Sequence, residues 1–211
     1  MRVLASLRQL GAGLRVLLLL TALLGLVYPL AVWGVSRIGA PSAEGSALRD
    51  SGGCVVGSAL IGVDPQVPVG TRDPYFHLRL DGDSTTGDGF TPGDPAAADA
   101  NDLGPNNQTL LGFVQARRAA VAARENIDPA AVPADAVTSS GSSIDPQISP
   151  AYAALQVPRV ARVTGLSVAQ VTAQVTAHTD GRQWGFLGAE RVNVPALNVA
   201  LGLTAPSCAT P

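Results

Sequence analysis

The chain has 211 residues, and every one of its 14 basic residues is an arginine. Without lysine it lacks the Walker A lysine of nucleotide-binding P-loops and the lysine that forms Schiff bases. After the apolar run described next, 11 arginines stand against 16 acids, a formal charge of −5, which argues against nucleic acid as a partner.

The N-terminal part carries an uncharged run of 21 residues between Arg15 and Arg37. As a helix this run is about 30 Å long, the hydrocarbon thickness of a bilayer, so we predict a transmembrane helix over residues 16–36. Only basic charges precede it, which predicts a cytoplasmic segment 1–15 and an extracytoplasmic location for everything after Arg37. A cleaved secretory signal is the alternative, but its apolar core would be shorter and no clear cleavage site follows near Ala40.

Three residues near the far end of this run refine the expectation. Tyr28 and Trp33 have amphipathic rings that favour the membrane–water interface. Pro29 is tolerated in a membrane helix but is expected to kink it.

The rest of the chain is expected to form a linker and one domain. Residues 37–53 are rich in Gly, Ser and Ala, and residues 54–211 have the size of a single domain. The apolar segment 54–63 is typical of a buried strand, and the alternating segment 75–80 is typical of a half-buried one.

A switch in composition marks residues 81–107, which carry six aspartates and no base. We expect a long loop here, and such loops in compact domains are usually functional or disordered. Its first residues suggest calcium, but an EF-hand loop starting at Asp81 would need Gly and Glu where Thr86 and Pro92 stand. We therefore expect a solvated acidic loop with no metal site, and an irregular cation site is the alternative.

The C-terminal half is predicted to be mainly helical. Residues 108–124 form one helix whose apolar face holds Leu110, Leu111, Val114, Ala119 and Val121. Two short helices are expected at 151–156 and 158–163, because Pro158 suits a first helical turn. Ser167 is expected to cap a helix that ends near His178, and a last helix is expected at 194–203. Together the elements indicate an α+β extracytoplasmic domain tethered by one transmembrane helix.

Catalytic machinery is hard to find in this sequence. Ser142 or Ser143, Asp145 and His178 contain the ingredients of a hydrolase triad. No G-x-S-x-G elbow surrounds either serine. A membrane-anchored extracytoplasmic serine hydrolase is therefore the alternative to a binding or assembly role, which we favour, with no catalytic residue and no bound cofactor.

Both cysteines, Cys54 and Cys208, follow the apolar run. On the outer side of a membrane a disulfide between them is permitted and would tie the start of the domain to its tail. Two free thiols are the alternative.

Several segments, taken in order behind one N-terminal helix, resemble a known family. They are GSALIG (57–62), YFHLR (75–79), NDLGPNNQTL (101–110), VTSSGSSIDPQISPAYAALQVPRVA (137–161), HTDGRQWGFLG (178–188) and RVNVPALNVAL (191–201). The chain is similar, from about Leu14 onward, to the C subunits of bacterial Kdp potassium-transporting P-type ATPases.

The resemblance implies a non-catalytic accessory subunit of a high-affinity potassium pump in the bacterial cell membrane. It implies as partners a channel-like potassium-binding subunit, a P-type subunit that hydrolyses ATP, and a small membrane subunit. The family is also described as a catalytic chaperone that raises ATP affinity. Since ATP lies inside and the domain is expected outside, we expect ATP and potassium to be handled by the partners, with no nucleotide pocket in this chain.

The matched motifs also indicate residues that contact partners. The charged or amide-bearing members are Asn106, Asn107, Asp145, Arg159, His178, Arg182 and Arg191. These side chains could instead hold the loops of the domain to one another. Within the predicted transmembrane helix, Thr21, Ala22 and Gly25 are small or polar residues expected to allow close packing against other subunits' helices.

Overall fold

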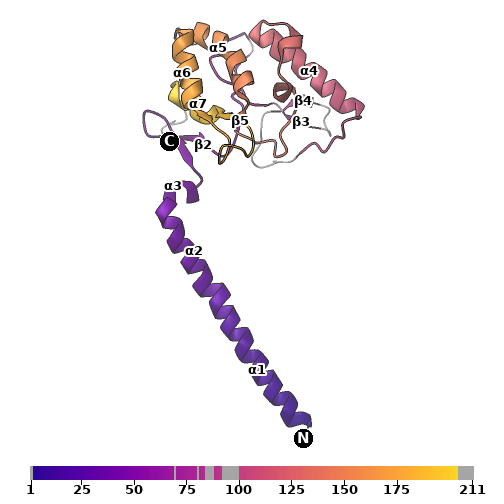
Figure 1. Cartoon of the computed structure of the whole chain (residues 1–211), viewed down its shortest axis with the longest axis vertical. Coiled ribbons are helices and arrows are strands. Elements are labelled where there is room, and N and C mark those ends of the chain that lie inside the picture. Colours follow the sequence, from indigo (N-terminus) through magenta and orange to yellow (C-terminus); the bar gives the residue numbers. More distant parts are fainter. Residues whose placement is uncertain (1, 69, 80, 84–87, 92–99, 204–211) are drawn as a thin grey trace. The chain divides into compact units, whose positions relative to one another are not determined.

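The computed structural model describes residues 2–68, 70–79, 81–83, 88–91 and 100–203 (Figure 1). The chain divides into two compact units, residues 1–46 and residues 47–211. Each unit is described by itself below.

The first unit is helical. Its elements are α1 (Arg2–Ala22), the π-helical turn η1 (Leu23–Val27), α2 (Tyr28–Ser36), the 3₁₀ turn η2 (Arg37–Gly39) and α3 (Ala40–Ala43). Together Ser6–Ala43 are long and apolar enough to cross a membrane. The π-turn ends at Val27, two residues before Pro29, which has no N–H to give to the regular α-helical ladder. The N–H of Tyr28 bonds to the carbonyl of Leu23, the i to i−5 bond of a π-turn.

The second unit holds three small antiparallel sheets. In the first, β1 (Ala47–Arg49) pairs with β2 (Val55–Ser58), and in the second β3 (Asp81–Asp83) pairs with β4 (Asp88–Thr91). The third has the order β5-β7-β6 and is built from Gln147–Ile148, Arg191–Asn193 and Thr179–Asp180. Small sheets and several helices make this unit an α+β structure, as predicted.

Helices make up most of the rest of this unit. They are α4 (Gln108–Glu125), the 3₁₀ turns η3 (Pro129–Ala131) and η4 (Ala134–Val137), α5 (Pro150–Thr164), α6 (Val168–Ala177) and α7 (Val194–Ala200). At the N-terminus of each of these α-helices a polar side chain accepts a hydrogen bond from a backbone N–H of the first turn; the acceptors on α4, α5, α6 and α7 are Asn107, Ser149, Ser167 and Asn193. Such caps satisfy N–H groups that have no intrahelical partner, which explains why the helices start there.

The core lies among α4, α5, α6, α7, η4, the strands β5 and β7, and residues 76–78. Its members are mostly Val, Ala and Leu, with Phe76 and Tyr152 as the aromatic residues. Helices α5 and α6 pack against each other. Their turn is closed by Gly165 in the left-handed region, at φ 77°, where a residue without Cβ is favoured.

Both predicted strands before residue 81 need correction. Only Val55–Ser58 of the predicted strand 54–63 is a strand, and Val55 is exposed because β2 pairs with β1 alone. Residues 75–79 form no strand, yet Phe76, His77 and Leu78 are buried one after another. An alternating pattern implies one buried face, whereas this segment is enclosed on both sides.

The predicted helices are closer to the structure. The expected break before Pro158 is wrong, since α5 runs through it as one helix. On α4 the buried side chains are Phe113, Arg117, Val121, Ala122 and Glu125. The predicted apolar face is confirmed at Val121, which is buried, and at Val114, which packs partly buried against the core, but it is wrong at Leu111 and Ala119, which are exposed. Two charged residues, Arg117 and Glu125, occupy the inner stripe instead. Helix α6 starts after Ser167 and ends before His178 as predicted, and α7 stops at Ala200.

The acidic region is not wholly a loop. It contains the paired strands β3 and β4, while residues 84–87 and 92–99 lie outside the described part of the chain. Thr86 and Pro92, which argued against an EF-hand, lie in those two segments.

Candidate functional site

The most distinctive polar feature of the second unit is a group of charged side chains in its interior, here called the ionic cluster. Three members come from the irregular segment before β3, two from the end of α4 and one from α5. They are Asp64, Asp73, His77, Arg124, Glu125 and Arg159.

His77 lies between two carboxylates. Its Nδ1 is 2.8 Å from Asp64 Oδ2, and its Nε2 is 2.7 Å from Asp73 Oδ2. A ring with both nitrogens facing carboxylates donates from both, which only the imidazolium can do. Burial lowers the pKa of His77, but hydrogen bonds to Asp64 and Asp73 outweigh that effect, so its pKa lies above the ordinary value.

Asp73 contacts both His77 and Arg159 and so links these two members of the cluster. Its carboxylate lies 3.3 Å from Nη1 of Arg159 as well as beside His77. Burial raises the pKa of Asp73, yet the hydrogen bond and charge of His77 and the charge of Arg159 hold it below its ordinary value. The two pKa shifts, up for His77 and down for Asp73, both favour the charged form of the side chain.

Arg159 is only 4% exposed, and all of its nitrogens are bonded. Its Nε donates to Glu125 Oε2 at 2.9 Å, Nη1 to the Asp73 carbonyl at 2.8 Å, and Nη2 to Gln156 Oε1 at 3.1 Å. Glu125 also accepts a 2.7 Å bond from Arg124. Buried charges held this completely indicate that the cluster joins α4, α5 and the segment before β3.

Two buried amides and one carboxylate explain how residues 76–78 are enclosed without a sheet, and the carboxylate is Asp64, which accepts from the N–H of Leu78 at 2.7 Å. Gln156 accepts from the N–H of His77 at 2.8 Å and donates to its carbonyl at 3.1 Å. Asn198 does the same for Phe76, at 2.9 Å in both directions. Each amide side chain thus takes the place of a neighbouring strand and satisfies a buried backbone pair.

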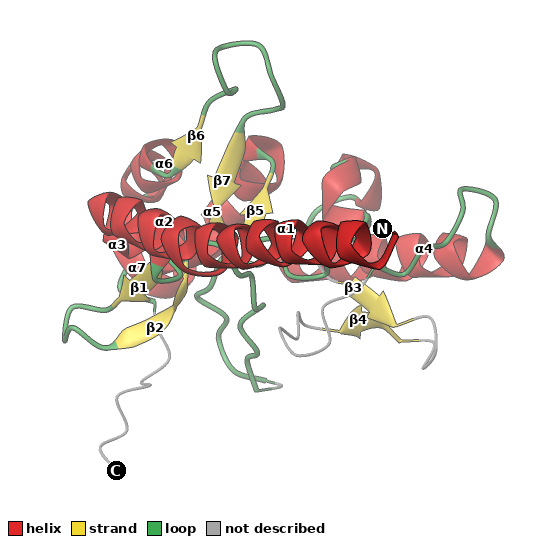
Figure 2. Ribbon diagram, turned by 90° about the horizontal axis from the view of Figure 1, so that it is seen from below, coloured by secondary structure: helices red, strands yellow, loops and turns green. Residues whose placement is uncertain are grey.

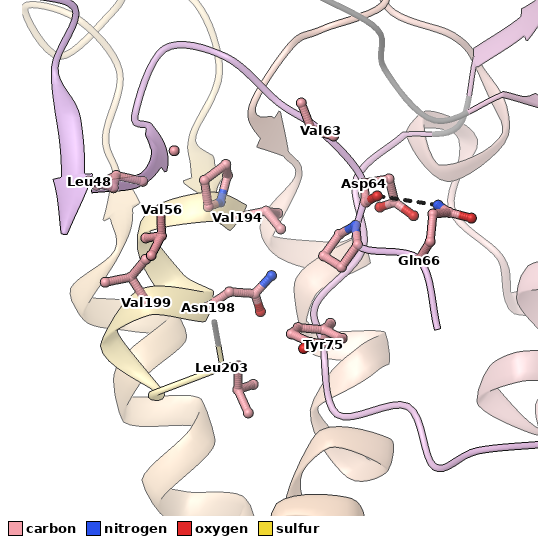
Figure 3. A pocket seen from close by; sticks show the side chains of 13 residues that line it. Leu48, Val56, Val63, Asp64, Gln66, Tyr75, Val194, Asn198, Val199 and Leu203 are labelled. Carbon is pink, nitrogen blue, oxygen red and sulfur yellow. Dashed lines mark hydrogen bonds between the residues drawn. The ribbon is translucent and has the colours of Figure 1, made fainter. Parts of the chain in front are cut away.

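Two pockets flank the cluster. One, of about 420 Å³, is mainly apolar; Figure 3 shows Val56 and Val199 facing Tyr75, with Asn198 between them, and Asp64 at its edge. The other, of about 510 Å³, is lined by Thr71, Arg72, Asp73, Arg124, Arg159, Arg162 and Val163. The two carboxylates that hold His77 thus line different pockets.

Asp145, a predicted contact residue, is used within the domain. Its carboxylate forms an ion pair with Arg79 and accepts from the N–H of Gln147. Behind it, the N–H of Gly62 donates to the Ile144 carbonyl at 2.7 Å, and a Cβ at Gly62 would lie 2.6 Å from the Asp145 carbonyl oxygen. Glycine is required at this close approach of two matched segments.

The other predicted residues divide between internal contacts and the surface. Asn107 caps α4, accepting from Thr109 at 2.8 Å, while Asn106 is exposed in the preceding turn. His178 ends α6, with Nδ1 2.8 Å from the Gln174 carbonyl. Arg191 lies in β7, 3.6 Å from Asp180, and Arg182 is exposed in the loop between β6 and β7. Asp145 and Arg191 line one pocket of about 510 Å³, whereas Arg159 belongs to the ionic cluster, so the structure brings only part of the set together.

Thr21, Ala22 and Gly25 lie in the first unit, at the end of α1 and in the π-turn. All three are exposed, and nothing lies within 4 Å of the position a Gly25 Cβ would take. Cys208 lies outside the described residues, so its disulfide with Cys54 stays a prediction.

The hydrolase alternative gains no support from the geometry. The Asp145 carboxylate bonds to Arg79, and His178 Nδ1 faces a backbone carbonyl of its own helix. Ser142 accepts from the N–H of Ile144 two residues on, a local turn contact. Within the described ranges, no group of three or more His, Cys, Asp and Glu side chains is arranged to hold a metal ion.

The sequence prediction missed most of this site. His77 fell within the predicted strand 75–80 without being singled out as a site residue, and neither were Asp64, Glu125, Gln156 and Asn198. One signal was available, since Arg117, Val121 and Glu125 share a stripe on α4 at i, i+4 spacing.

Comparison with known proteins gives a consistent result. The family described as K+-transporting ATPase, c chain (KdpC), matches residues 10–202. The potassium-transporting ATPase KdpC subunit of Kineococcus radiotolerans is 47% identical over 200 residues, covering 95% of this chain and 96% of that protein. The protein of the same name from Caulobacter vibrioides is 46% identical, covering 91% of this chain and 91% of that protein. The one from Mycobacterium tuberculosis H37Rv is 45% identical, covering 92% of this chain and 97% of that protein. The chain therefore belongs to the KdpC family, which confirms the resemblance seen in its sequence.

Proposed function

We propose that this chain is an accessory, non-catalytic subunit of an ATP-driven, high-affinity potassium uptake pump, needed for assembly and stability of the complex. The observation that carries this proposal is the family match across residues 10–202. Relatives 45–47% identical, aligned over more than nine-tenths of the chain, are named subunits of a potassium-transporting ATPase.

The partners in this proposal are the channel-like potassium-binding subunit, the P-type catalytic subunit and the small membrane subunit. The long apolar helix Ser6–Ala43 supports a single-pass location in the bacterial cell membrane. Because Arg2, Arg8 and Arg15 precede its uncharged run, the N-terminus is cytoplasmic and the second unit extracytoplasmic.

In this arrangement ATP and potassium are bound by the partner subunits. Any rise in ATP affinity, the catalytic-chaperone role, must then pass through the membrane helices as a coupling free energy between distant sites. The ionic cluster is consistent with a scaffold, because its arginines and acids bond to one another, to amides and to backbone carbonyls.

The test is affinity purification of the tagged full-length chain from native membranes grown at limiting potassium. We expect a polytopic channel-like protein and a P-type ATPase to co-purify, and a strain lacking the chain to stop growing under these conditions. A monodisperse solitary protein, free of both, would contradict the proposal.

The same growth assay separates the hydrolase alternative. The S142A/S143A double variant is expected to restore growth as well as the wild-type chain. Loss of growth with an intact complex would instead favour serine chemistry.

A further inference from the structure

The loop between β6 and β7 carries two exposed aromatic side chains at its end. Trp184 is 77% exposed and Phe186 is 68% exposed, and Leu187 beside them is also exposed. Figure 2 shows this loop extending away from the helices of the second unit. We call residues 184–187 the aromatic tip.

The backbone of the aromatic tip is fixed by its own hydrogen bonds. Gln183 and Leu187 exchange two bonds of 2.9 Å, N–H to carbonyl in each direction, and the N–H of Gly185 donates to the Arg182 carbonyl at 3.0 Å. Trp184 and Gly185 both have positive φ, 54° and 82°. The side chains are thus presented on a closed turn, which lowers the entropy lost when a partner binds.

The exposure is unusual for this domain. Aromatic residues make up only 4% of the chain, and Phe76, Phe113 and Tyr152 are buried. Trp184 and Phe186 are the most exposed large apolar side chains among the described residues of the second unit, and they lie two positions apart in one turn. Neighbouring exposed aromatics on a fixed turn have the composition of an interface hot spot.

The charged residues beside the aromatic tip indicate whether its partner is a protein or an anionic lipid surface. Asp180, Arg182, Glu190 and Arg191 contribute two positive and two negative charges, so the tip has none of the cationic surplus that draws segments to anionic lipid. Asp180 pairs with Arg191 at 3.6 Å, and Arg182 and Glu190 are exposed. An apolar centre with a mixed polar rim is the pattern of a protein–protein contact.

We propose that the aromatic tip inserts into an apolar pocket on another protein subunit of the pump, with a polar rim that meets Arg182 and Glu190. The proposal rests on the proposed function, which supplies the partner, and adds the surface through which the subunit is held. In the assembled complex Trp184 and Phe186 are buried, and in the solitary chain they face water.

The experiment uses the full-length chain in a W33F background, which leaves Trp184 as the only tryptophan. Fluorescence is compared between the solitary chain in detergent and the purified complex reconstituted with tryptophan-free partner subunits. We expect the emission to shift to shorter wavelength and acrylamide quenching to fall several-fold on assembly. Unchanged emission and quenching would overturn the proposal.

A second arm measures assembly. We expect W184S/F186S to reduce recovery of the partner subunits at least tenfold, while L111S/V168S, which also removes two exposed apolar side chains, leaves it unchanged. Thermal unfolding of each solitary variant shows whether the domain is intact. Full recovery of the partner subunits with W184S/F186S would overturn the proposal for the aromatic tip but not the role as a pump subunit. Failure of the wild-type chain to recover any partner subunit would overturn the proposed function itself.

A third arm tests a lipid surface as the occupant. The W33F chain without partners is placed in bilayers containing brominated lipids, which quench tryptophan only on contact. We expect no quenching of Trp184. Strong quenching there would show that the tip binds lipid and would contradict a protein partner.

Discussion

The ionic cluster and the aromatic tip reverse the usual placement of side chains. Six charged residues lie largely inside the domain, whereas Trp184 and Phe186 stand in water. The charged groups have partners within the chain, so their positions are explained by the fold alone. The aromatic groups are held on a closed turn that leaves their rings exposed, and we have proposed a partner subunit that covers them.

This contrast separates two kinds of sensitivity to mutation. Removing one member of the cluster leaves a buried charge without its partner. The unfolding free energy should then fall, and every function that needs the folded domain should fall with it. Removing the tip deletes exposed surface, which should spare stability and reduce assembly alone. The predictions below run from the largest expected change in stability to the smallest.

Arg159→Ala should have the largest effect. It leaves Glu125 and Asp73 buried without their shared guanidinium partner, and breaking a buried ion pair costs about 3–5 kcal/mol of unfolding free energy. Arg162→Ala, on the same helix but exposed, is the control and should change stability by less than about 0.5 kcal/mol. Thermal unfolding of the full-length chain in detergent measures both, and equal melting temperatures for the two variants would contradict the role given to Arg159.

Asn198→Ala should cost less. It leaves the N–H and carbonyl of Phe76 buried without the amide that bonds to both. Unsatisfied backbone groups of this kind cost about 1–3 kcal/mol each, so we expect a loss of about 2–3 kcal/mol in chemical unfolding. Asn106→Ala, in an exposed turn, is the matched control. A loss below 0.5 kcal/mol for Asn198→Ala, on the order of a surface change, would show that water replaces the amide.

The protonation of His77 predicts how stability varies with pH. Its pKa in the folded chain is above the ordinary 6.5, so its contribution is fully present below about pH 6.5 and is lost as the pH rises through the folded value. Asp73 has a lowered pKa against an ordinary 3.8, so its contribution is present above about pH 3.8 and is lost in stronger acid.

Unfolding free energies of the wild-type chain and His77→Asn, measured from pH 5 to 9, test this point. The difference in unfolding free energy between the wild-type chain and His77→Asn should shrink as the pH rises. His178→Asn separates any contribution of the second histidine. A wild-type advantage that grew toward alkaline pH would contradict the double carboxylate contact.

The tip should have the smallest effect on stability. W184S/F186S removes exposed side chains only, so the unfolding free energy should stay within about 0.5 kcal/mol of the wild type. A loss of 2 kcal/mol or more, which is on the scale of a lost core side chain, would place the rings in the interior. The tip would then resemble the ionic cluster rather than contrast with it.

Local signals predicted the helices well. Ser167 caps α6 as expected. A kink was predicted at Pro29; the structure has a π-turn over Leu23–Val27, which the sequence did not specify, and the kink itself stays a prediction. Such features depend on residues within one or two turns of each other. Pro158 was misleading because proline is acceptable both at a helix start and, at a cost, inside a helix that packing stabilises.

The buried site depended on partners far apart in the sequence. Phe76 and His77 are enclosed because Asn198 and Gln156, some 120 and 80 positions away, bond to their backbone. A period-2 pattern cannot distinguish that arrangement from a half-buried strand. The ionic cluster likewise unites three segments, and no spacing within one segment indicates it. For the tip, the residues Trp184 and Phe186 were visible in the sequence, but their exposure was not.

The most direct test of the contrast combines assembly and stability in one preparation of W184S/F186S. The fraction of partner subunits recovered with the tagged chain is measured beside the melting temperature of the same solitary variant. We expect a melting temperature within about 2 °C of the wild type, because a change of 1 kcal/mol shifts a domain of this size by about 2–4 °C, together with at least a tenfold loss of recovered partners. Full recovery of the partners, or a fall in melting temperature as large as that of Arg159→Ala, would contradict it.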